Sequence, residues 1–200
     1  MSAERYKTPG AEYAIGSLIR LMKVQGRGEC MMGISIRYVN TGDIDSLATI
    51  HSRSLQTAFK GMVADEILDT AFSFERRKSG FTRELNEGRP TTAIMFDGDN
   101  GVGLLSFGFS RYIDIEEDTI ELWRIYLVPE VWGTGVGQEL FNWGIDEIRK
   151  LGYKRVILWV LEENLRARRF YEKHGFVPDG RCIEADHGRK VNELLYIREL

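Results

Sequence analysis

The sequence predicts an α/β (α+β) chain in which a mixed sheet of about seven strands is flanked by helices. Short apolar runs alternate with polar residues as strands do, and longer segments have the spacing of amphipathic helices. Turn-forming glycine, proline and asparagine residues separate these segments. Along the chain the order is one strand, two helices, three strands, a helix, a strand, a helix and two strands. This order is typical of a mixed sheet with helices packed against it.

The first half of the chain supplies a strand, two helical regions and a hairpin. Strand-like alternation starts at 34–38, and Thr41 or Asp43 is expected to cap the helix that follows. The apolar stripe of that helix consists of Ile44, Leu47, Ile50 and Leu55. A charged helical region extends over about 63–81. Two β-prone runs within 91–111 are separated by Asp-Gly and Asn-Gly pairs, which predicts a hairpin.

A strand, a glycine-rich loop and a helix follow one another in the middle of the second half. The strand at 118–128 ends at Pro129, which cannot continue a central strand. The helix at 138–153 is closed by Gly152, because glycine readily adopts the left-handed conformation of a helix end. Its inward side chains are expected to be Leu140, Phe141, Ile145 and Ile148.

The C-terminal part is predicted to add a buried strand, a short helix and two further strands. Residues 155–161 are nearly all apolar, as in a strand covered on both faces. A short helix within 164–176 ends at Gly175. The last two strand candidates lie around 181–184 and 192–198.

Composition argues for a globular protein and against several other classes. The chain has 200 residues, 43% of them hydrophobic and 28% charged, with a formal net charge of -3. A protein that binds nucleic acid through phosphate neutralisation is normally more basic, so no nucleic-acid partner is expected. No apolar run approaches the length of a membrane span and nothing resembles a cleavable signal, so we expect no membrane partner.

The cysteines, the histidines and the N-terminal segment each allow a limited inference. Cys30 and Cys182 are far apart and lack metal-ligand spacing, which favours a reducing, cytoplasmic location. Three histidines are scattered, so no metal is expected. Residues 1–32 are interpreted as an extension with amphipathic helical spacing, and residues 33–200 as the domain; a surface or dimer-contact helix is the alternative for the extension.

The stretch PEVWGTGVGQEL, residues 129–140, places three glycines at alternate positions just before a helix. Glycine this dense at a helix N-terminus brings backbone amides close to an anion, such as a nucleotide, a dinucleotide or the pyrophosphate of coenzyme A. A nucleoside triphosphatase loop needs a lysine and a hydroxyl after its last glycine, and Gln138 and Glu139 stand there instead. The spacing also departs from the GxGxxG of dinucleotide sites. The alternative is that the glycines only form a strand-to-helix turn that binds no ligand.

The glycine loop and the segment at 164–176 together resemble two motifs of a known family, in the same order along the chain. The run Trp132-Gly133-Thr134-Gly135-Val136-Gly137 resembles the pyrophosphate loop of the GNAT superfamily of acetyl-CoA-dependent N-acetyltransferases, with Trp132 where a polar residue is usual. The run NLRARRFYEKHGF, 164–176, is similar to the family's Asn-x-x-Ala-x-x-Phe-Tyr signature. The resemblance spans roughly 33–200 and implies the GNAT fold, a mixed, mostly antiparallel central sheet of about seven strands flanked by helices.

The resemblance implies an N-acetyltransferase that moves an acetyl group from acetyl-CoA, its cosubstrate, to a primary amine of a small molecule or peptide by direct attack in a ternary complex. The strand at 118–128 corresponds to one that splays from its neighbour, so backbone amides there hold the thioester, with the Leu127 amide as oxyanion donor. Tyr171 matches the general acid for the leaving thiolate. The cofactor-binding residues implied are Ile125, Tyr126, Leu127, Gly133, Thr134, Gly135, Val136, Gly137, Gln138, Asn164, Ala167 and Tyr171.

The spacing of the short helix supports that assignment from the residues themselves. Asn164 and Tyr171 lie two helical turns apart and so project from one face. Asn164 is then placed to hold the pantetheine arm while Tyr171 approaches the sulfur, and the small Ala167 leaves room for the cofactor. Phe170 is more typical of the core.

The general base and the acceptor are left open by the sequence. Glu121 has the spacing of a catalytic glutamate in some family members, but a solvated charge at a strand end and a water chain are equal alternatives. A second family position for a glutamate holds Trp159 here. Five carboxylates within 114–121 favour a cationic acceptor unless they only form a solvated turn. Polyamine, protein N-terminal and antibiotic acetylators remain possible models, as does a homodimer. A non-catalytic acetyl-CoA sensor is the alternative function.

Overall fold

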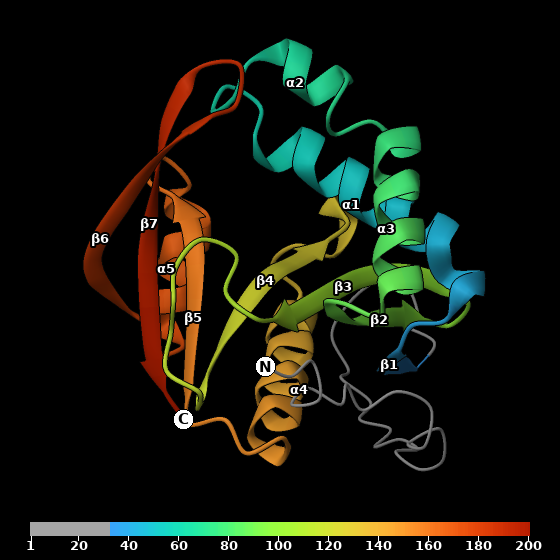
Figure 1. The fold of residues 1–200 in the computed structure, drawn as a ribbon. Coiled ribbons are helices and arrows are strands. Elements are labelled where there is room, and N and C mark those ends of the chain that lie inside the picture. Colours follow the sequence, from blue (N-terminus) through green and yellow to red (C-terminus); the bar gives the residue numbers. More distant parts are fainter. Residues whose placement is uncertain (1–32) are drawn as a thin grey trace.

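The computed structural model describes residues 33–200, which form one seven-stranded sheet with helices on both faces (Figure 1). The extension predicted at 1–32 lies outside the described residues. The order of strands across the sheet is β1-β2-β3-β4-β5-β7-β6. All neighbours are antiparallel except β4 and β5, which are parallel. The predicted mixed, mostly antiparallel sheet is therefore confirmed.

The strands agree with the predicted order, and the last two are longer than expected. In chain order they are β1 (Ile34–Tyr38), β2 (Thr91–Asp97), β3 (Asn100–Gly108), β4 (Thr119–Leu127), β5 (Arg155–Leu161), β6 (Val177–Asp186) and β7 (Lys190–Glu199). The predicted hairpin is the β2–β3 pair, which turns at Gly98 in the left-handed region (φ 57°). β6 and β7 extend beyond the predicted segments because their alternating polar residues face solvent, which weakens the apolar signal of a strand.

The helices are α1 (Ile44–Ala58), α2 (Asp65–Asp69), α3 (Phe74–Glu87), α4 (Val136–Lys150) and α5 (Leu165–Lys173). Short 3-10 turns precede α1 (η1, Thr41–Asp43) and α4 (η2, Pro129–Val131).

Two predictions about these helices need correction. The single helical region expected at about 63–81 is in fact α2 and α3, because Ser73 caps a new helix after an intervening turn. Asp43, one of the two expected caps, is the N-cap residue of α1, but its side chain makes no capping hydrogen bond there. The side-chain cap is made earlier, at the start of η1, by Asn40. Its side chain accepts a hydrogen bond from the Gly42 amide at 2.8 Å, while the Asp43 carboxylate accepts one from the Asn40 amide. This reciprocal pair is a capping box.

The core lies on both faces of the sheet. α1 and α3 pack together on one face, whereas α4 lies against β3 and β4 on the other (Figure 1). The inward residues predicted for α4 are all buried, among them Leu140 and Phe141, which have no exposed surface. Gly144 lets α4 approach β3 closely, since a Cβ there would lie 2.5 Å from a methyl group of Leu105.

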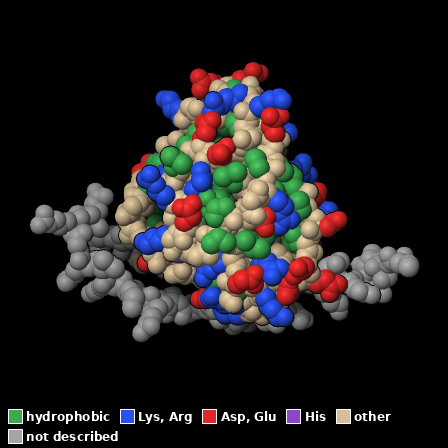
Figure 2. Space-filling model, turned by 90° about the vertical axis from the view of Figure 1, so that its left-hand side faces the viewer, with side chains coloured by type: hydrophobic (Ala, Val, Ile, Leu, Met, Phe, Trp, Pro, Cys, Tyr) green, Lys and Arg blue, Asp and Glu red, His purple; other side chains and the backbone are tan. Residues whose placement is uncertain are grey.

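The β6–β7 hairpin forms one side of the molecule and reaches over to α2. Hydrophobic side chains on this side lie among charged ones (Figure 2). The turn after β6 contacts the segment before α2, because the Ala64 amide donates to the His187 carbonyl oxygen at 3.1 Å. Gly188 packs so closely there that a Cβ would lie 2.6 Å from that of Ala64. The hairpin therefore covers one end of the space between β4 and α1.

Candidate active site

The central sheet opens between β4 and β5. The two strands are in register only at their first residues, ending where Glu121 lies opposite Ile157. Beyond that point β4 continues to pair with β3, and β5 continues to pair with β7. The carboxyl-terminal halves of the two parallel strands are therefore separated by a gap, as the resemblance implied.

A β-bulge in β4 accompanies the opening. The ladder passes from Leu122 to Arg124 while β3 advances by a single residue, so Trp123 is an extra residue. Such a bulge bends a strand and increases its local twist. It lies just beyond the last residue of β4 paired with β5, where the two strands begin to separate.

Two amides of β4 point into the gap. The Val128 amide donates to the Val102 carbonyl oxygen of β3 at 2.9 Å. Because paired and unpaired positions alternate along an antiparallel ladder, the amides of Leu127 and Ile125 face away from β3. By the same alternation the Tyr126 amide faces β3. Of the three β4 amides expected at the thioester, two are thus directed toward the gap and one belongs to the ladder.

Four amides at the start of α4 have no acceptor among the described residues. Gly135 is the N-cap of α4 and has no side chain to cap it. The Thr134 and Gln138 amides donate to carbonyl oxygens of Val131 and Gly135, at 3.4 and 2.9 Å. The amides without an acceptor in this part of the chain are those of Gly133, Gly135, Val136 and Gly137. Unpaired amides at a helix N-terminus form a site for an anion.

Backbone conformation, rather than crowding, explains two of the loop glycines. Gly133 and Gly135 have φ of 79° and 99°, and a Cβ at either position would meet no atom within 4 Å. Glycine alone adopts such conformations without strain. Gly137 differs, because a Cβ there would lie 3.3 Å from a methyl group of Leu127.

Trp132, which the family pattern did not explain, fastens the glycine loop to β4. Its indole N–H donates to the Leu127 carbonyl oxygen at 2.8 Å, and the Ser54 hydroxyl donates to the same oxygen at 2.7 Å. The Arg166 guanidinium of α5 lies 3.6 Å from the centroid of the indole ring. A cation over an aromatic face is attracted by it. Trp132 therefore connects the loop, the end of β4 and α5.

Asn164 and Tyr171 both face the gap from α5. Asn164 is the N-cap of the helix, and its carboxamide oxygen accepts from the Ala167 amide at 3.1 Å. Its amide N–H groups have no acceptor among the described residues. The Tyr171 hydroxyl likewise has no partner there, although its ring packs against Phe176. Burial raises the pKa of Tyr171, and nearby Tyr126 raises it further, so the phenol stays protonated at neutral pH.

A cavity of about 380 Å³ follows the gap and extends to α1 and α3. Six of the predicted site residues line it: Ile125, Tyr126, Leu127, Asn164, Ala167 and Tyr171. The glycine loop, 133–138, is not part of the lining but continues directly from Trp132, which is. The structure thus brings six of the thirteen predicted site residues to one cavity and places the six residues of the loop beside it.

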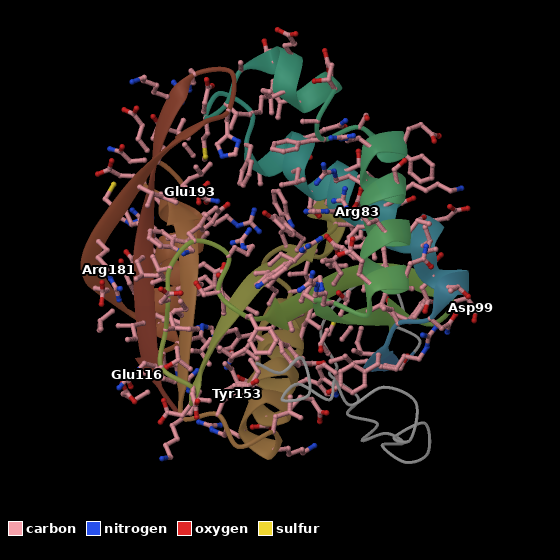
Figure 3. All side chains as sticks on the ribbon, in the orientation of Figure 1. Arg83, Asp99, Glu116, Tyr153, Arg181 and Glu193 are labelled. Carbon is pink, nitrogen blue, oxygen red and sulfur yellow. The ribbon has the colours of Figure 1, made fainter. Side chains whose placement is uncertain are left out.

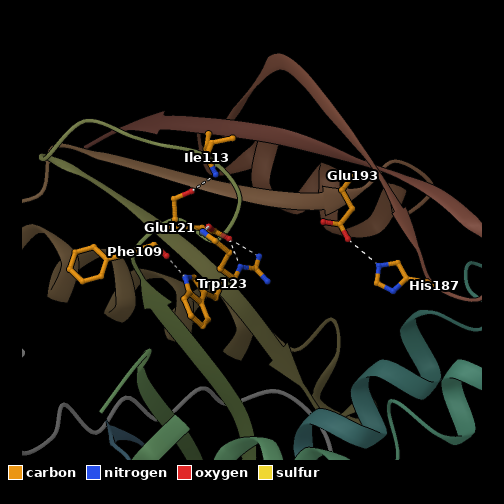
Figure 4. A network of polar contacts seen from close by, with 8 residues as sticks. Phe109, Ile113, Glu121, Trp123, His187 and Glu193 are labelled. Atoms are coloured by element: carbon orange, nitrogen blue, oxygen red, sulfur yellow. Dashed lines mark hydrogen bonds and ion pairs between the residues drawn. The ribbon is translucent and has the colours of Figure 1, made fainter. Parts of the chain in front are cut away.

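Glu121 does not line this cavity. Its side chain has no exposed surface, and Figure 4 marks the hydrogen bonds that its carboxylate accepts. The carboxylate accepts from the Arg111 amide at 2.8 Å and from its Nε at 2.7 Å, and lies 2.5 Å from its Nη2. Both oxygens are therefore occupied. Arg111 itself lines the cavity, so Glu121 positions a cavity residue.

The wall formed by α3 and β4 is charged. Arg77 and Glu84 lie two turns apart on one face of α3, and both line the cavity with Arg124. Glu84 accepts from Arg124 at 2.8 Å, whereas Arg77 forms no ion pair with any described residue. Buried atoms without a hydrogen-bond partner in this part of the chain include Arg77 Nε, Glu84 Oε2 and His51 Nδ1.

The pKa values along this wall reflect burial and positive charge. Burial lowers the pKa of Arg77, and the charge of Arg124 lowers it further. Burial also lowers the pKa of His51 well below its ordinary value, with added contributions from Arg124 and Arg77. His51 is therefore neutral, and its ring packs on that of Tyr126 at 4.7 Å between centroids.

A histidine and a glutamate face the cavity from the β6–β7 hairpin. His187 lies in the turn and Glu193 on β7, and their side chains point toward one another (Figure 4). Nε2 of His187 is 3.1 Å from Oε1 of Glu193. When Nε2 carries the proton in this contact, Nδ1 is left as a proton acceptor.

Three of the five carboxylates in the acidic run 114–121 are paired with basic side chains, whereas Asp114 and Glu117 are exposed. Glu121 is buried against Arg111, Glu116 pairs with Arg155 at 2.7 Å, and Asp118 lies 3.7 Å from Lys154. Glu116, labelled in Figure 3, belongs to the segment that crosses β5 before β4 begins. These pairs reduce the attraction for a cation, and the cationic acceptor stays a prediction.

Sequence reasoning missed Arg77, Arg124 and His187. Arg77 could have been found from the sequence, because Arg77, Phe81 and Glu84 have the spacing of one helical face in a charged segment. Arg124 stands in an otherwise apolar strand segment, which is also unusual. His187 lies in a polar turn, and only the docking of that turn on α2 brings it to the cavity.

Neither a membrane span nor a metal site is found in residues 33–200. No described helix is long and apolar enough to cross a membrane. No group of three or more histidine, cysteine, aspartate or glutamate side chains in this range is arranged to hold a metal ion. The predicted cytoplasmic location and homodimer remain predictions.

Comparison with known proteins agrees with this geometry. The model of the Acetyltransferase (GNAT) family matches residues 62–176. The chain is 28% identical over 158 residues to an uncharacterized N-acetyltransferase of Mycobacterium bovis, covering 79% of this chain and 98% of the relative. It is 28% identical over 147 residues to the L-amino acid N-acyltransferase of Escherichia coli, covering 72% and 80%.

Solved structures share the fold. The PaiA N-acetyltransferase from Thermoplasma acidophilum, solved in complex with coenzyme A, superposes with a TM-score of 0.64 at 20% sequence identity. The match covers 84% of this chain and 100% of that one.

Proposed function

The chain belongs to the acetyltransferase (GNAT) family and is an acyltransferase, and we propose that it transfers the acetyl group of acetyl-CoA to a primary amine. The acceptor is a small molecule or peptide, and the amine attacks directly in a ternary complex. The opening of the sheet between β4 and β5 carries this proposal, because it directs the amides of Ile125 and Leu127 to a cavity that also holds Tyr171.

The residues present fit coenzyme A. The unpaired amides at the start of α4 suit a pyrophosphate, since amides at a helix N-terminus favour anions. The gap between the strands suits an extended pantetheine arm, which needs amide partners of the kind that Ile125 and Asn164 offer. When bound, acetyl-CoA supplies the activated thioester.

The side of the gap formed by β4 and α5 then provides two groups for the chemistry. The Leu127 amide donates to the thioester carbonyl oxygen as negative charge develops on it. The amine nitrogen forms a bond to the carbonyl carbon as the carbon–sulfur bond breaks. The Tyr171 phenol, which keeps its proton at neutral pH, donates that proton to the departing thiolate.

The proton of the attacking amine needs an acceptor, and His187 fits this task better than Glu121. Both oxygens of Glu121 already accept bonds from Arg111, and the carboxylate lies outside the cavity lining. His187 lines the cavity and is held by Glu193. We expect His187 to take the amine proton, which returns through solvent to the Tyr171 phenolate, so that thiol and amide are the products.

An acceptor screen tests the proposal. Free thiol release from acetyl-CoA is followed across amino acids, peptides, polyamines and aminoglycosides, and the acetylated product is identified by mass. We expect turnover with at least one amine class. A protein that binds acetyl-CoA in calorimetry but releases no thiol with any amine contradicts the transferase proposal and favours the sensor alternative.

A further inference from the structure

The acceptor end of the cavity carries an unmatched positive charge. Cavity-lining residues include four arginines, Arg77, Arg111, Arg124 and Arg166, but only two glutamates, Glu84 and Glu193. Arg111 is neutralised by Glu121 behind it, and Arg124 by Glu84. Arg166 lies over Trp132 near the glycine loop. Arg77 is left without a counter-ion among the described residues, next to the Arg124–Glu84 pair.

The unpaired atoms of this wall also require a partner. Arg77 Nε is buried and donates to no described acceptor. A buried charged donor without a partner is costly, and native structures usually supply one from a ligand, a water or an ion. Burial lowers the pKa of Arg77 and of His51, and the charge of neighbouring arginines lowers both further. An anion at this wall would give Arg77 Nε an acceptor and balance its charge, whereas Glu84 Oε2, which is also buried and unpaired, would need a donor.

We propose that the amine acceptor carries a carboxylate, and that Arg77, together with Arg124, binds it. This inference rests on the proposed function, whose reaction it makes selective for amino-carboxylate substrates. A planar guanidinium matches a carboxylate with paired N–H donors, so a small anion of this shape suits the site. A polyamine would instead place further positive charge beside Arg77.

Apolar residues of the cavity indicate what the part of the acceptor between its amine and its carboxylate would contact. Leu55, Phe59 and Phe72 line the cavity on the α1 side, and Leu55 and Phe72 belong to one buried cluster. Apolar and aromatic side chains of this kind favour an apolar body between the amine and the wall. The structure therefore favours amino acids with apolar side chains, or longer apolar amino carboxylates.

The Arg124–Glu84 pair also connects β4 to α3, so a substitution of Arg124 would disturb the packing as well as the site. Arg77 is therefore the better residue to test. Arg77 makes no ion pair in the described chain, so Arg77→Gln removes charge without breaking one, although the Arg77 guanidinium also lies 6.0 Å from the centroid of the Phe72 ring. Arg83→Gln is the matched control. Arg83 lies on the same helix, is exposed and does not line the cavity (Figure 3).

The experiment compares matched pairs of acceptors. Initial rates are measured for L-leucine, L-phenylalanine and 4-aminobutyrate and for the carboxamide of each, with spermidine as a cationic acceptor. We expect the wild type to prefer the best carboxylate over its carboxamide in kcat/KM by about 10- to 100-fold, the range for a charged hydrogen bond. Arg77→Gln brings that ratio close to one, mainly through KM, whereas Arg83→Gln leaves it unchanged.

Three outcomes separate the two proposals. A carboxamide or spermidine used as well as every carboxylate overturns the carboxylate site while leaving the transferase proposal standing. A carboxylate preference that survives in Arg77→Gln also overturns it. If nothing is acetylated, calorimetry with the same pairs decides. If the wild type binds the carboxylate more tightly than its carboxamide and Arg77→Gln loses this preference, the carboxylate site is supported and only the reaction is contradicted. If the carboxylate and its carboxamide bind equally, the carboxylate site is contradicted as well.

Discussion

The two ends of the cavity differ in the groups that face them, which are mainly backbone at one end and side chains at the other. At the cofactor end most of the proposed contacts are backbone amides, from the loop at 133–138 and from Ile125 and Leu127 of β4, joined by the Asn164 and Tyr171 side chains. At the acceptor end they are polar side chains from three separate elements: the guanidinium groups of Arg77 on α3 and Arg124 on β4, and the imidazole of His187 in the β6–β7 turn.

This difference predicts that the two ends respond differently to substitution. A backbone site depends on φ values and on strand pairing, so it tolerates most side-chain changes away from its glycines. A side-chain site changes its ligand when one or two residues change. We therefore expect substitutions at the cofactor end to act through conformation, and substitutions at the acceptor end to act through charge.

Tyr171→Phe should have the largest effect on rate, because it removes the proposed acid and keeps the ring. We expect kcat to fall by about 10²- to 10⁴-fold, the usual range for acid catalysis, with unchanged coenzyme A affinity in calorimetry. The raised pKa also predicts a pH profile. The phenol holds its proton beyond its ordinary value of 10.0, so no loss of rate from its ionisation is expected as the pH rises toward that value. An unchanged kcat would remove Tyr171 from the mechanism.

His187→Gln tests whether the acceptor end supplies the base. We expect kcat/KM to fall by about 10²-fold and to recover partly at higher pH, where more of the amine is already neutral. Rates across a pH series measure this recovery. His174→Gln is a control at the C-cap of α5, since His174 packs against Phe170 and does not line the cavity. A uniform loss at every pH would indicate a structural role for His187.

Glu121→Gln separates positioning from base catalysis. The substitution leaves the guanidinium of Arg111 without its charge partner, so we expect a loss of about 3 kcal/mol in the free energy of unfolding. Asp146→Asn breaks the exposed Asp146–Arg149 pair and should cost less than about 0.5 kcal/mol. Chemical denaturation measures both. A variant as stable as the wild type, with kcat reduced by orders of magnitude, would restore Glu121 as the base.

Gly135→Ala tests the backbone construction of the cofactor end. The left-handed conformation (φ 99°) costs about 1–2 kcal/mol for alanine, although the space around the Cβ is open. We expect that loss of stability together with coenzyme A binding about tenfold weaker. Gly152, beyond the other end of α4, has φ of 88° and equally open space. Gly152→Ala should therefore lose similar stability and keep its affinity, and equal affinities for both variants would contradict the loop's role.

Trp132→Phe should have the smallest effect, because it removes one N–H and keeps a ring beneath Arg166. Loss of the bond to the Leu127 carbonyl costs about 1 kcal/mol. We expect several-fold weaker coenzyme A binding, because the loop is then less firmly held to β4. Ser54→Ala removes the other donor to that oxygen without touching the loop. Its affinity should stay near that of the wild type, and a matching loss would show that the carbonyl, rather than the loop, matters.

Much of the fold was predictable because its signals are local. The period of apolar residues identified the seven strands, and the buried side chains expected on α4 are buried. The errors lie where local signals compete. Asn40 caps the first helical segment although Thr41 and Asp43 stand beside it, and a turn divides the expected helix at 63–81 into α2 and α3.

The sequence by itself determined the cofactor end. Glycines at 133 and 135 permit the left-handed backbone that the loop adopts, and the spacing of Asn164 and Tyr171 is that of one side of a short helix. Only the tertiary structure decided the acceptor end. Whether Glu121 is a base or a partner of Arg111, and whether Arg77 meets Arg124, depends on contacts between residues far apart in the chain. Such contacts form through strand pairing and helix packing, and the local sequence around each residue does not show which distant residue it will meet.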